Sequence, residues 1–140
     1  MEFHVESASR MPIYRQLVAQ IREAVARGRL KPEERLPSVR DLSRQLVINP
    51  NTVARVYTEL ERDGVLNTRP GMGVFVAQPK NELTKKVRRE RLLVALDGFL
   101  TESVHLGFSA EEVLALVTER MAKFQFTVGW DKAASAVGPP

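Results

Sequence analysis

The stretch from Leu36 to Gly64 constrains the fold most, because two short helical patterns in it come with clear start and stop signals. In the second pattern, apolar residues recur at the spacing by which a helix buries one face. These residues are Val53, Val56, Tyr57 and Leu60. Asn49 can cap this helix, Pro50 suits its first position and Gly64 can end it. The stretch therefore predicts two helices joined by a tight turn.

The opposite face of the second helix carries short polar and basic side chains. They are Asn51, Thr52, Arg55, Thr58 and Arg62. Such side chains reach base edges in the major groove of DNA, and arginine also reaches phosphate. Each also has a simpler interpretation as a cap, a turn former or a solvated charge. Their combination favours a DNA-reading helix, with Arg55 as the leading contact to phosphate or guanine.

The first helix of the pair has its own signals. Ser38, followed by Asp41, resembles a capping box with Asp in place of the usual Glu or Gln. Its apolar side is formed by three residues, and two arginines lie outside. The apolar residues are Val39, Leu42 and Leu46, and the arginines are Arg40 and Arg44.

The segments on either side complete a small domain. Residues 3–5 suggest a short edge strand, a helix is expected from Met11 and Pro12 to Gly28, and residues 29–35 suggest a connecting loop. After Gly64, residues 65–68 and 74–77 flank a turn that contains Pro and Gly, which predicts a β-hairpin. Helix, helix-turn-helix and hairpin together form a winged helix-turn-helix.

The rest of the chain predicts two more helices. One runs from Glu82 to about Val104, and a capping box at Ser109 and Glu112 opens the second after a break at Gly107. Two helices of this size cannot bury both apolar faces against each other, so we expect a homodimer. The alternative is that the pair folds back on the N-terminal domain. The expected fold is mostly α with a small β-hairpin: a DNA-binding domain at 1–78, a dimerisation module at 79–126 and a flexible tail at 127–140 that holds Trp130.

Composition excludes several classes of protein. The 140 residues hold no cysteine, carry a net charge of +4 and include no apolar run long enough to span a membrane. The N-terminus lacks a signal-peptide pattern, so we expect a cytoplasmic protein. His4 and His105 lie in unrelated segments, and His105 with Asp97 makes no tight metal cluster. We expect no enzymatic activity, no cofactor and no metal.

Several strings in the first half of the chain resemble a known family. They are P-I-Y-R-Q-L, G-R-L-K-P, L-P-S-V-R-D-L, N-P-N-T-V-A-R-V-Y-x-E-L-E-R-D-G and R-P-G-M-G-V-F-V. Together, from Phe3 to Val76, they resemble the GntR family of bacterial transcription factors, and more narrowly its short YtrA-like branch. The resemblance implies a homodimeric DNA-binding repressor whose DNA contacts include Arg40, Asn49, Asn51, Thr52 and Gly71. The predicted DNA-binding set adds Ser38, Arg55 and Arg69.

Two positions depart from the family pattern. Many members carry Arg at the positions of Pro50 and Ala54, so the bases that they read cannot be transferred to this chain. Residues 31–34 lack the Gly usual in that loop, which we expect to affect only local geometry.

The sequence thus predicts a homodimeric repressor on a palindromic operator, with half-sites about 10 base pairs apart. The branch resemblance suggests control of a nearby transporter operon. Any small-molecule effector is expected at the dimer interface, because too little chain follows the hairpin for a roomy enclosed pocket. The alternative from another class is a protein-interaction adaptor built on a winged helix. A small RNA-binding protein ranks last, because the sequence lacks exposed aromatic residues for stacking.

Overall fold

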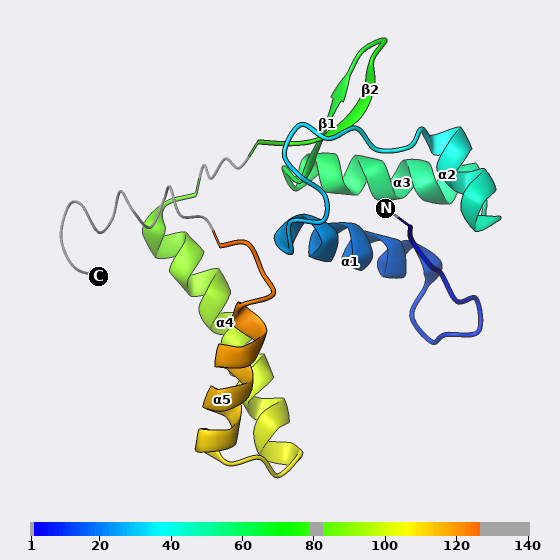
Figure 1. Cartoon of the computed structure of the whole chain (residues 1–140). Coiled ribbons are helices and arrows are strands. Elements are labelled where there is room, and N and C mark those ends of the chain that lie inside the picture. Colours follow the sequence, from blue (N-terminus) through cyan, green and yellow to red (C-terminus); the bar gives the residue numbers. More distant parts are fainter. Residues whose placement is uncertain (1, 79–82, 127–140) are drawn as a thin grey trace. The chain divides into compact units, whose positions relative to one another are not determined.

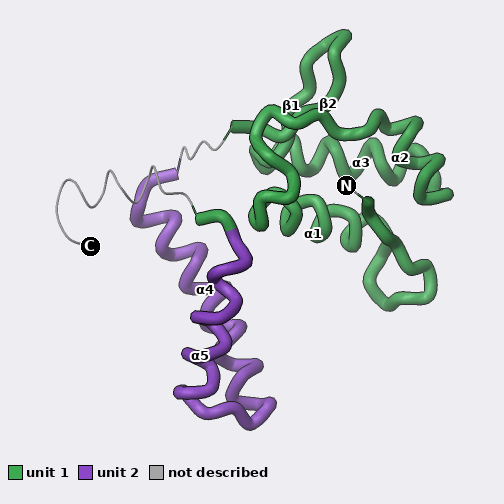
Figure 2. The backbone as a smooth tube through the Cα atoms, in the orientation of Figure 1, with its two compact units in different colours: residues 1–80, 125–140 green, residues 81–124 purple. Residues whose placement is uncertain are grey.

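The structure, a computed structural model, describes residues 2–78 and 83–126 (Figure 1). The chain divides into two compact units, one of residues 1–80 with 125–140 and the other of residues 81–124 (Figure 2). The predicted tail with Trp130, and Glu82 as a helix start, lie outside the described residues.

The first unit contains three helices followed by a hairpin. The helices are α1 (Ile13–Ala26), α2 (Val39–Leu46) and α3 (Pro50–Arg62). The hairpin pairs β1 (Leu66–Arg69) with β2 (Gly73–Val76) in antiparallel register, and it projects from the C-terminal end of α3 (Figure 1). The predicted architecture, mostly helical with one hairpin, is confirmed, and each strand is shifted by one residue from its expected start or end.

The core of this unit lies between the three helices and the base of the hairpin. The α3 stripe is buried as predicted: Val53, Val56 and Leu60 have no exposed surface, and Tyr57 is nearly as deep. Leu17 and Ile21 of α1 and Leu42 of α2 are also fully buried. Leu66 and Val76 join the hairpin to the same core, so the hairpin is anchored at its base rather than along its length.

The turn between α2 and α3 ends α2 with an unusual residue. Val47 has φ 56°, in the left-handed region, and its N–H donates to the Arg44 carbonyl at 3.3 Å. The next N–H, of Ile48, donates to the Ser43 carbonyl at 3.0 Å, and the two bonds together form a Schellman motif. Glycine usually occupies this position, because a Cβ is strained there and a branched one most of all. The side chain of Val47 is 89% exposed, so packing offsets little of that strain.

The loop before α2 forms backbone hydrogen bonds with β2. The Glu33 N–H donates to the Val76 carbonyl (2.9 Å), the Leu36 N–H donates to the Val74 carbonyl (2.8 Å), and Arg35 forms a β-bridge with Phe75. This segment is therefore a loop that is bonded to β2 through an isolated bridge, where the sequence suggested only a connection. Glu33 takes φ 71°, so the chain here adopts a glycine-like conformation without the glycine.

The N-terminal segment corrects one expectation. Residues 3–5 form no strand in the structure. The backbone N–H of His4 instead donates to the Gln20 side-chain oxygen of α1 at 3.0 Å, and the Gln20 amide donates back to the His4 carbonyl. A side-chain amide thus supplies the bonds that a neighbouring strand would have given, while Phe3 is buried in the core.

The second unit is a helical hairpin made of α4 (Lys85–His105) and α5 (Ala110–Met121). Thr84 caps α4 by accepting from the Val87 N–H, and Ser109 and Glu112 form the reciprocal capping box that the sequence predicts. Within the described residues, Ser103 is the one buried position on α4 and Val113 the one on α5. The apolar side chains of this unit are otherwise largely exposed.

Candidate nucleic-acid interface

Two capped helix N-termini carry most of the predicted DNA contacts. Ser38 caps α2, its oxygen accepting from the Asp41 N–H at 3.0 Å, and Asn49 caps α3, its oxygen accepting from the Asn51 N–H at 2.8 Å. Both caps use an acceptor atom, so the Ser38 hydroxyl proton and the Asn49 amide protons remain for another acceptor. Helix N-termini and side-chain donors of this kind bind phosphate oxygens or the acceptor atoms of bases.

A buried tyrosine joins the two N-termini. The Tyr57 hydroxyl on α3 donates to the carbonyl of Pro37, just before α2, at 2.6 Å. Burial raises the pKa of Tyr57, so the hydroxyl stays protonated and remains a donor. The entry of α2 is therefore fixed against α3, which makes Tyr57 a structural residue, as the sequence indicates.

Exposed basic side chains lie along both helices, from the first turn of α2 to the last turn of α3. Arg40 and Arg44 are exposed on α2 and Arg62 is exposed on α3; none forms an ion pair within the described part of the chain. Asn51 is exposed in the first turn of α3, and Thr52 beside it is half-buried. The exposed surface of the α2–α3 pair therefore offers arginines and hydrogen-bond donors, with the exposed carboxylates of Asp41 and Glu61 beside them.

Arg55, the leading candidate, does not simply project into solvent. Its guanidinium carbon lies 3.7 Å from the centroid of the Tyr14 ring on α1. Arg15 approaches the same tyrosine, with its guanidinium carbon 5.9 Å from the ring centroid and its Nε donating to the hydroxyl at 3.3 Å. Two cations from two helices thus share one aromatic ring, a contact for which spacing along the sequence gave no signal.

The tip of the hairpin is a four-residue turn. The Met72 N–H donates to the Arg69 carbonyl at 2.9 Å, and Pro70 and Gly71 occupy the two central positions. Gly71 has φ 74°, as a type II turn requires at that position, and a Cβ there would meet no atom within 4 Å. The Gly71 backbone is therefore open to a close approach by another molecule.

Arg69, at the start of this turn, already has partners. Its guanidinium forms an ion pair with Glu33 and lies 4.2 Å from the centroid of the Phe75 ring. Arg35 lies beside it against Gly73, where a Cβ would come within 2.9 Å of the Arg35 Nε. The hairpin thus holds two arginines in place next to its turn, and sequence spacing gave no signal for Glu33 or Arg35.

The predicted set therefore falls into two groups. Ser38, Arg40, Asn49, Asn51, Thr52 and Arg55 lie on the caps and first two turns of α2 and α3, two helices in direct contact. Arg69 and Gly71 lie on the hairpin, at the other end of α3 (Figure 1).

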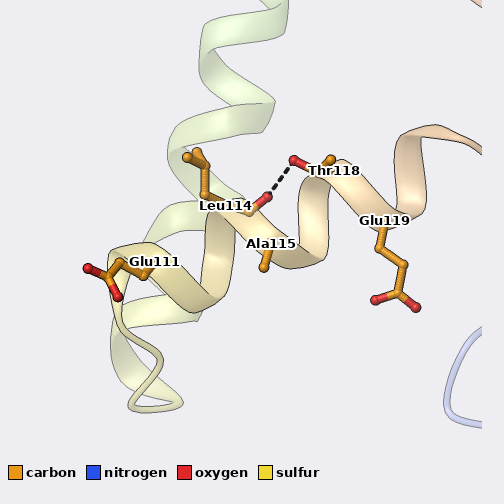
Figure 3. Close-up of a pocket in the computed structure, with 5 residues that line it drawn as sticks. All are labelled: Glu111, Leu114, Ala115, Thr118 and Glu119. Atoms are coloured by element: carbon orange, nitrogen blue, oxygen red, sulfur yellow. Dashed lines mark hydrogen bonds between the residues drawn. The ribbon is translucent and has the colours of Figure 1, made fainter.

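Among the described residues, no group of three or more His, Cys, Asp or Glu side chains could hold a metal ion. The described helices include none that is both long and apolar enough to cross a membrane. A hollow of about 570 Å³ on α5 is lined by Glu111, Leu114, Ala115, Thr118 and Glu119 (Figure 3). Because one helix supplies all five residues, the hollow is an open helix face and not an enclosed pocket.

A helix-turn-helix with exposed donors and cations, followed by a hairpin wing, defines the winged helix-turn-helix class of DNA-binding domains. Residues 13–76 match the family described as "Bacterial regulatory proteins, gntR family". The chain belongs to this family and to its YtrA-like branch, and it is a transcriptional regulator with a DNA-binding domain.

The relatives cover both units of the chain. YhcF, an HTH-type transcriptional regulator of Bacillus subtilis, is 40% identical over 76% of this chain and 87% of its own length. The HTH-type transcriptional repressor YtrA of the same organism is 30% identical over 82% of this chain and 88% of its own length. A solved structure, of a transcriptional antiterminator from Listeria monocytogenes, has a TM-score of 0.73 and 33% identity over 86% of this chain and 90% of that one.

Proposed function

We propose that this chain is a homodimeric repressor in which α3 enters the DNA major groove at each half of a palindromic operator. The observation that carries the proposal is the pair of capped N-termini on α2 and α3, whose free donors lie near Arg40, an arginine that forms no ion pair with any carboxylate of the described residues. In this arrangement Arg40 and the Ser38 hydroxyl contact phosphate, while Asn49, Asn51 and Thr52 face base edges. Gly71 lets the wing backbone approach the neighbouring groove.

The second copy is supported by the exposed apolar surface of the helical hairpin. Leu92 on α4 and Leu114 on α5 are each 70% exposed, and Val104 and Leu106 are exposed to a similar extent. Such a concentration of apolar surface on two short helices is typical of an interface. A twofold partner would cover it and set the two α3 helices for half-sites about one helical turn apart.

Repression, rather than activation, is proposed because the relative YtrA is named a repressor. A dimer that occupies an operator blocks polymerase without any further contact, and the helical hairpin that follows the wing in the described residues would serve such a dimer. The assignment to a transporter operon and to the cytoplasm rests on the YtrA-like branch and is part of the same proposal.

Selection of bound fragments from random duplexes tests the DNA side. We expect a palindromic consensus, and affinity for it should fall steeply with salt, because each neutralised phosphate releases counterions. Arg40→Ala should weaken binding, and Arg29→Ala, also exposed but outside the two N-termini, is the matched control. A protein-interaction adaptor would enrich no consensus and would ignore duplex DNA at any salt concentration; that result would reject the proposal.

Sedimentation of the full chain tests the dimer. Leu92→Glu and Leu114→Glu replace exposed side chains, so neither buries a charge within one protomer, and both should shift the chain towards monomer. Arg91→Glu adds the same carboxylate at an exposed neighbouring position without removing apolar area, and it should leave the dimer intact. A wild-type chain that sediments as a monomer at micromolar concentration would contradict the dimer and leave the DNA site untouched.

A further inference from the structure

We propose that Tyr14 is a positioning residue that holds Arg55 for a backbone phosphate at the edge of α3, not for a base. The inference rests on the proposed function, since it assumes that α3 enters the groove. It assigns a role in DNA binding to α1, a helix outside the helix-turn-helix. It also decides between the two ligands, phosphate and guanine, that the sequence left open for Arg55.

The placement of α1 against α3 carries the first step. The two helices lie side by side and run in the same direction (Figure 1). Tyr14 meets Arg55 near their N-terminal ends, and eight residues further along each helix Arg22 pairs with Asp63 at 3.7 Å. The repeated spacing fixes the register between the helices, so the Tyr14 ring is presented beside the second turn of α3.

The second step concerns where the guanidinium lies. Arg55 projects from the exposed side of α3, opposite the buried stripe, but its guanidinium turns back to rest on a ring of α1. When a helix lies in the major groove, the middle of its exposed face meets base edges and its flanks meet the sugar-phosphate walls. A guanidinium held between α3 and α1 is on a flank, so phosphate is its ligand.

The third step is chemical. A cation–π contact is an attraction to the ring and not an ion pair, so the guanidinium keeps N–H groups available for a bidentate contact with phosphate oxygens. The ring is neutral, so it holds the cation without neutralising it, whereas a carboxylate would have to be displaced first. Arg15 donates to the Tyr14 hydroxyl at the rim of the ring, so this bond does not occupy the face on which Arg55 rests. Arg55 is thereby ordered before DNA arrives, which lowers the side-chain entropy lost on binding.

The test uses four variants of the full chain: Tyr14→Leu, Tyr14→Phe, Arg55→Ala and the double variant Tyr14→Leu/Arg55→Ala. Leucine keeps apolar packing against the core without a π face, and phenylalanine keeps the face without the hydroxyl. The probes are a mixed-sequence duplex of about 30 base pairs, long enough for two half-sites, and the selected operator with each base pair changed in turn. Binding is measured over a range of salt concentrations, and thermal melting of each variant reports folding.

We expect Tyr14→Leu to bind both probes about two- to fivefold more weakly, the loss that an exposed cation–π contact implies. Tyr14→Phe should match the wild type. Arg55→Ala should weaken binding by one factor across all operator changes and reduce the salt slope by about one. The double variant should be no weaker than Arg55→Ala, because Tyr14 acts only through Arg55.

Each part can fail separately. Tyr14→Leu binding like the wild type, or losses that add in the double variant, would refute the positioning role. A loss for Arg55→Ala confined to one base pair would show that Arg55 reads guanine. A wild-type chain that binds no duplex at low salt would instead refute the proposed function.

One measurement needs no DNA. A guanidinium 3.7 Å from a ring centroid lies in the shielding region of the ring, so the Arg55 Nε proton should resonate upfield in the free protein. Tyr14→Leu should remove this shift and Tyr14→Phe should keep it. An Arg55 proton at its ordinary position in the wild type would overturn the contact itself, whatever the DNA experiments show.

Discussion

The strained turn between α2 and α3 gives a stability prediction whose magnitude follows from the structure. Val47 occupies the left-handed position of the Schellman motif with φ 56°. A residue with a Cβ costs about 1–2 kcal/mol in this region. Because the side chain is 89% exposed, replacing it removes little burial. Glycine would relieve the strain and so raise the free energy of unfolding. Its greater freedom in the unfolded chain offsets about 0.5–1 kcal/mol of that increase.

We therefore expect Val47→Gly to raise the free energy of unfolding by about 0.5–1 kcal/mol. Asparagine tolerates the left-handed region and has less conformational entropy in the unfolded chain than glycine. Val47→Asn should therefore raise the free energy of unfolding at least as much as Val47→Gly. For a unit of this size, 1 kcal/mol corresponds to about 4–8 °C in Tm. Thermal melting followed by circular dichroism measures both variants, and operator binding serves as a check that the turn keeps its shape.

The control for this prediction is Val47→Thr. Threonine keeps the branched Cβ and removes only apolar character, so it should leave Tm near that of the wild type. If Val47→Thr stabilised the protein as much as Val47→Gly, the gain would come from removing an exposed apolar side chain and not from the backbone. A Val47→Gly variant that melts at or below the wild-type temperature would refute the reasoning about strain.

Three further changes test the surroundings of the site. Tyr57→Phe loses the bond to the Pro37 carbonyl, which should lower the free energy of unfolding in urea by about 1 kcal/mol. Because burial raises the pKa of Tyr57, the wild type should also lose stability as pH rises above about 10, the ordinary tyrosine pKa. Tyr57→Phe should not show that loss at high pH. Glu33→Gln frees Arg69 from its carboxylate and should tighten operator binding with a steeper salt slope, while Glu34→Gln, which removes a neighbouring charge, should not steepen it. Gly73→Ala should lower Tm more than Gly71→Ala, because both glycines have positive φ but only at Gly73 would the new Cβ meet a side chain, that of Arg35.

The elements that could be predicted are those whose signals are local. The α3 stripe, its Asn49 cap and the capping box of α5 each lie within a few residues, and the structure confirms all of them. The hairpin is similarly encoded by a Pro-Gly turn between apolar runs. In each case the residues that specify the element also make its hydrogen bonds, so spacing along the sequence is enough.

The contacts that were missed join residues far apart in the sequence. Tyr14 and Arg55 belong to different helices, and Glu33 reaches Arg69 across 36 positions. No local pattern distinguishes an arginine that stacks on a distant ring from one that is solvated. The strand expected at residues 3–5 was wrong for a related reason. Apolar alternation suits a strand, but the backbone N–H of His4 bonds to the side chain of Gln20 on α1 and not to a neighbouring strand.

The two arginines at opposite ends of α3 are held by different means, and the difference ranks their contributions to DNA binding. Arg69 is paired with Glu33, so a phosphate that takes Arg69 breaks one ion pair to form another, and the net gain is small. Arg55 rests on a neutral ring, so its contact with phosphate breaks no ion pair within the described residues. We therefore expect Arg69→Ala to cost less operator affinity than Arg55→Ala. In the Glu33→Gln background, Arg69→Ala should cost more operator affinity than in the wild type, because Arg69 there breaks no ion pair with Glu33 when it binds phosphate. An unchanged loss of affinity would show that Glu33 does not compete with DNA for Arg69.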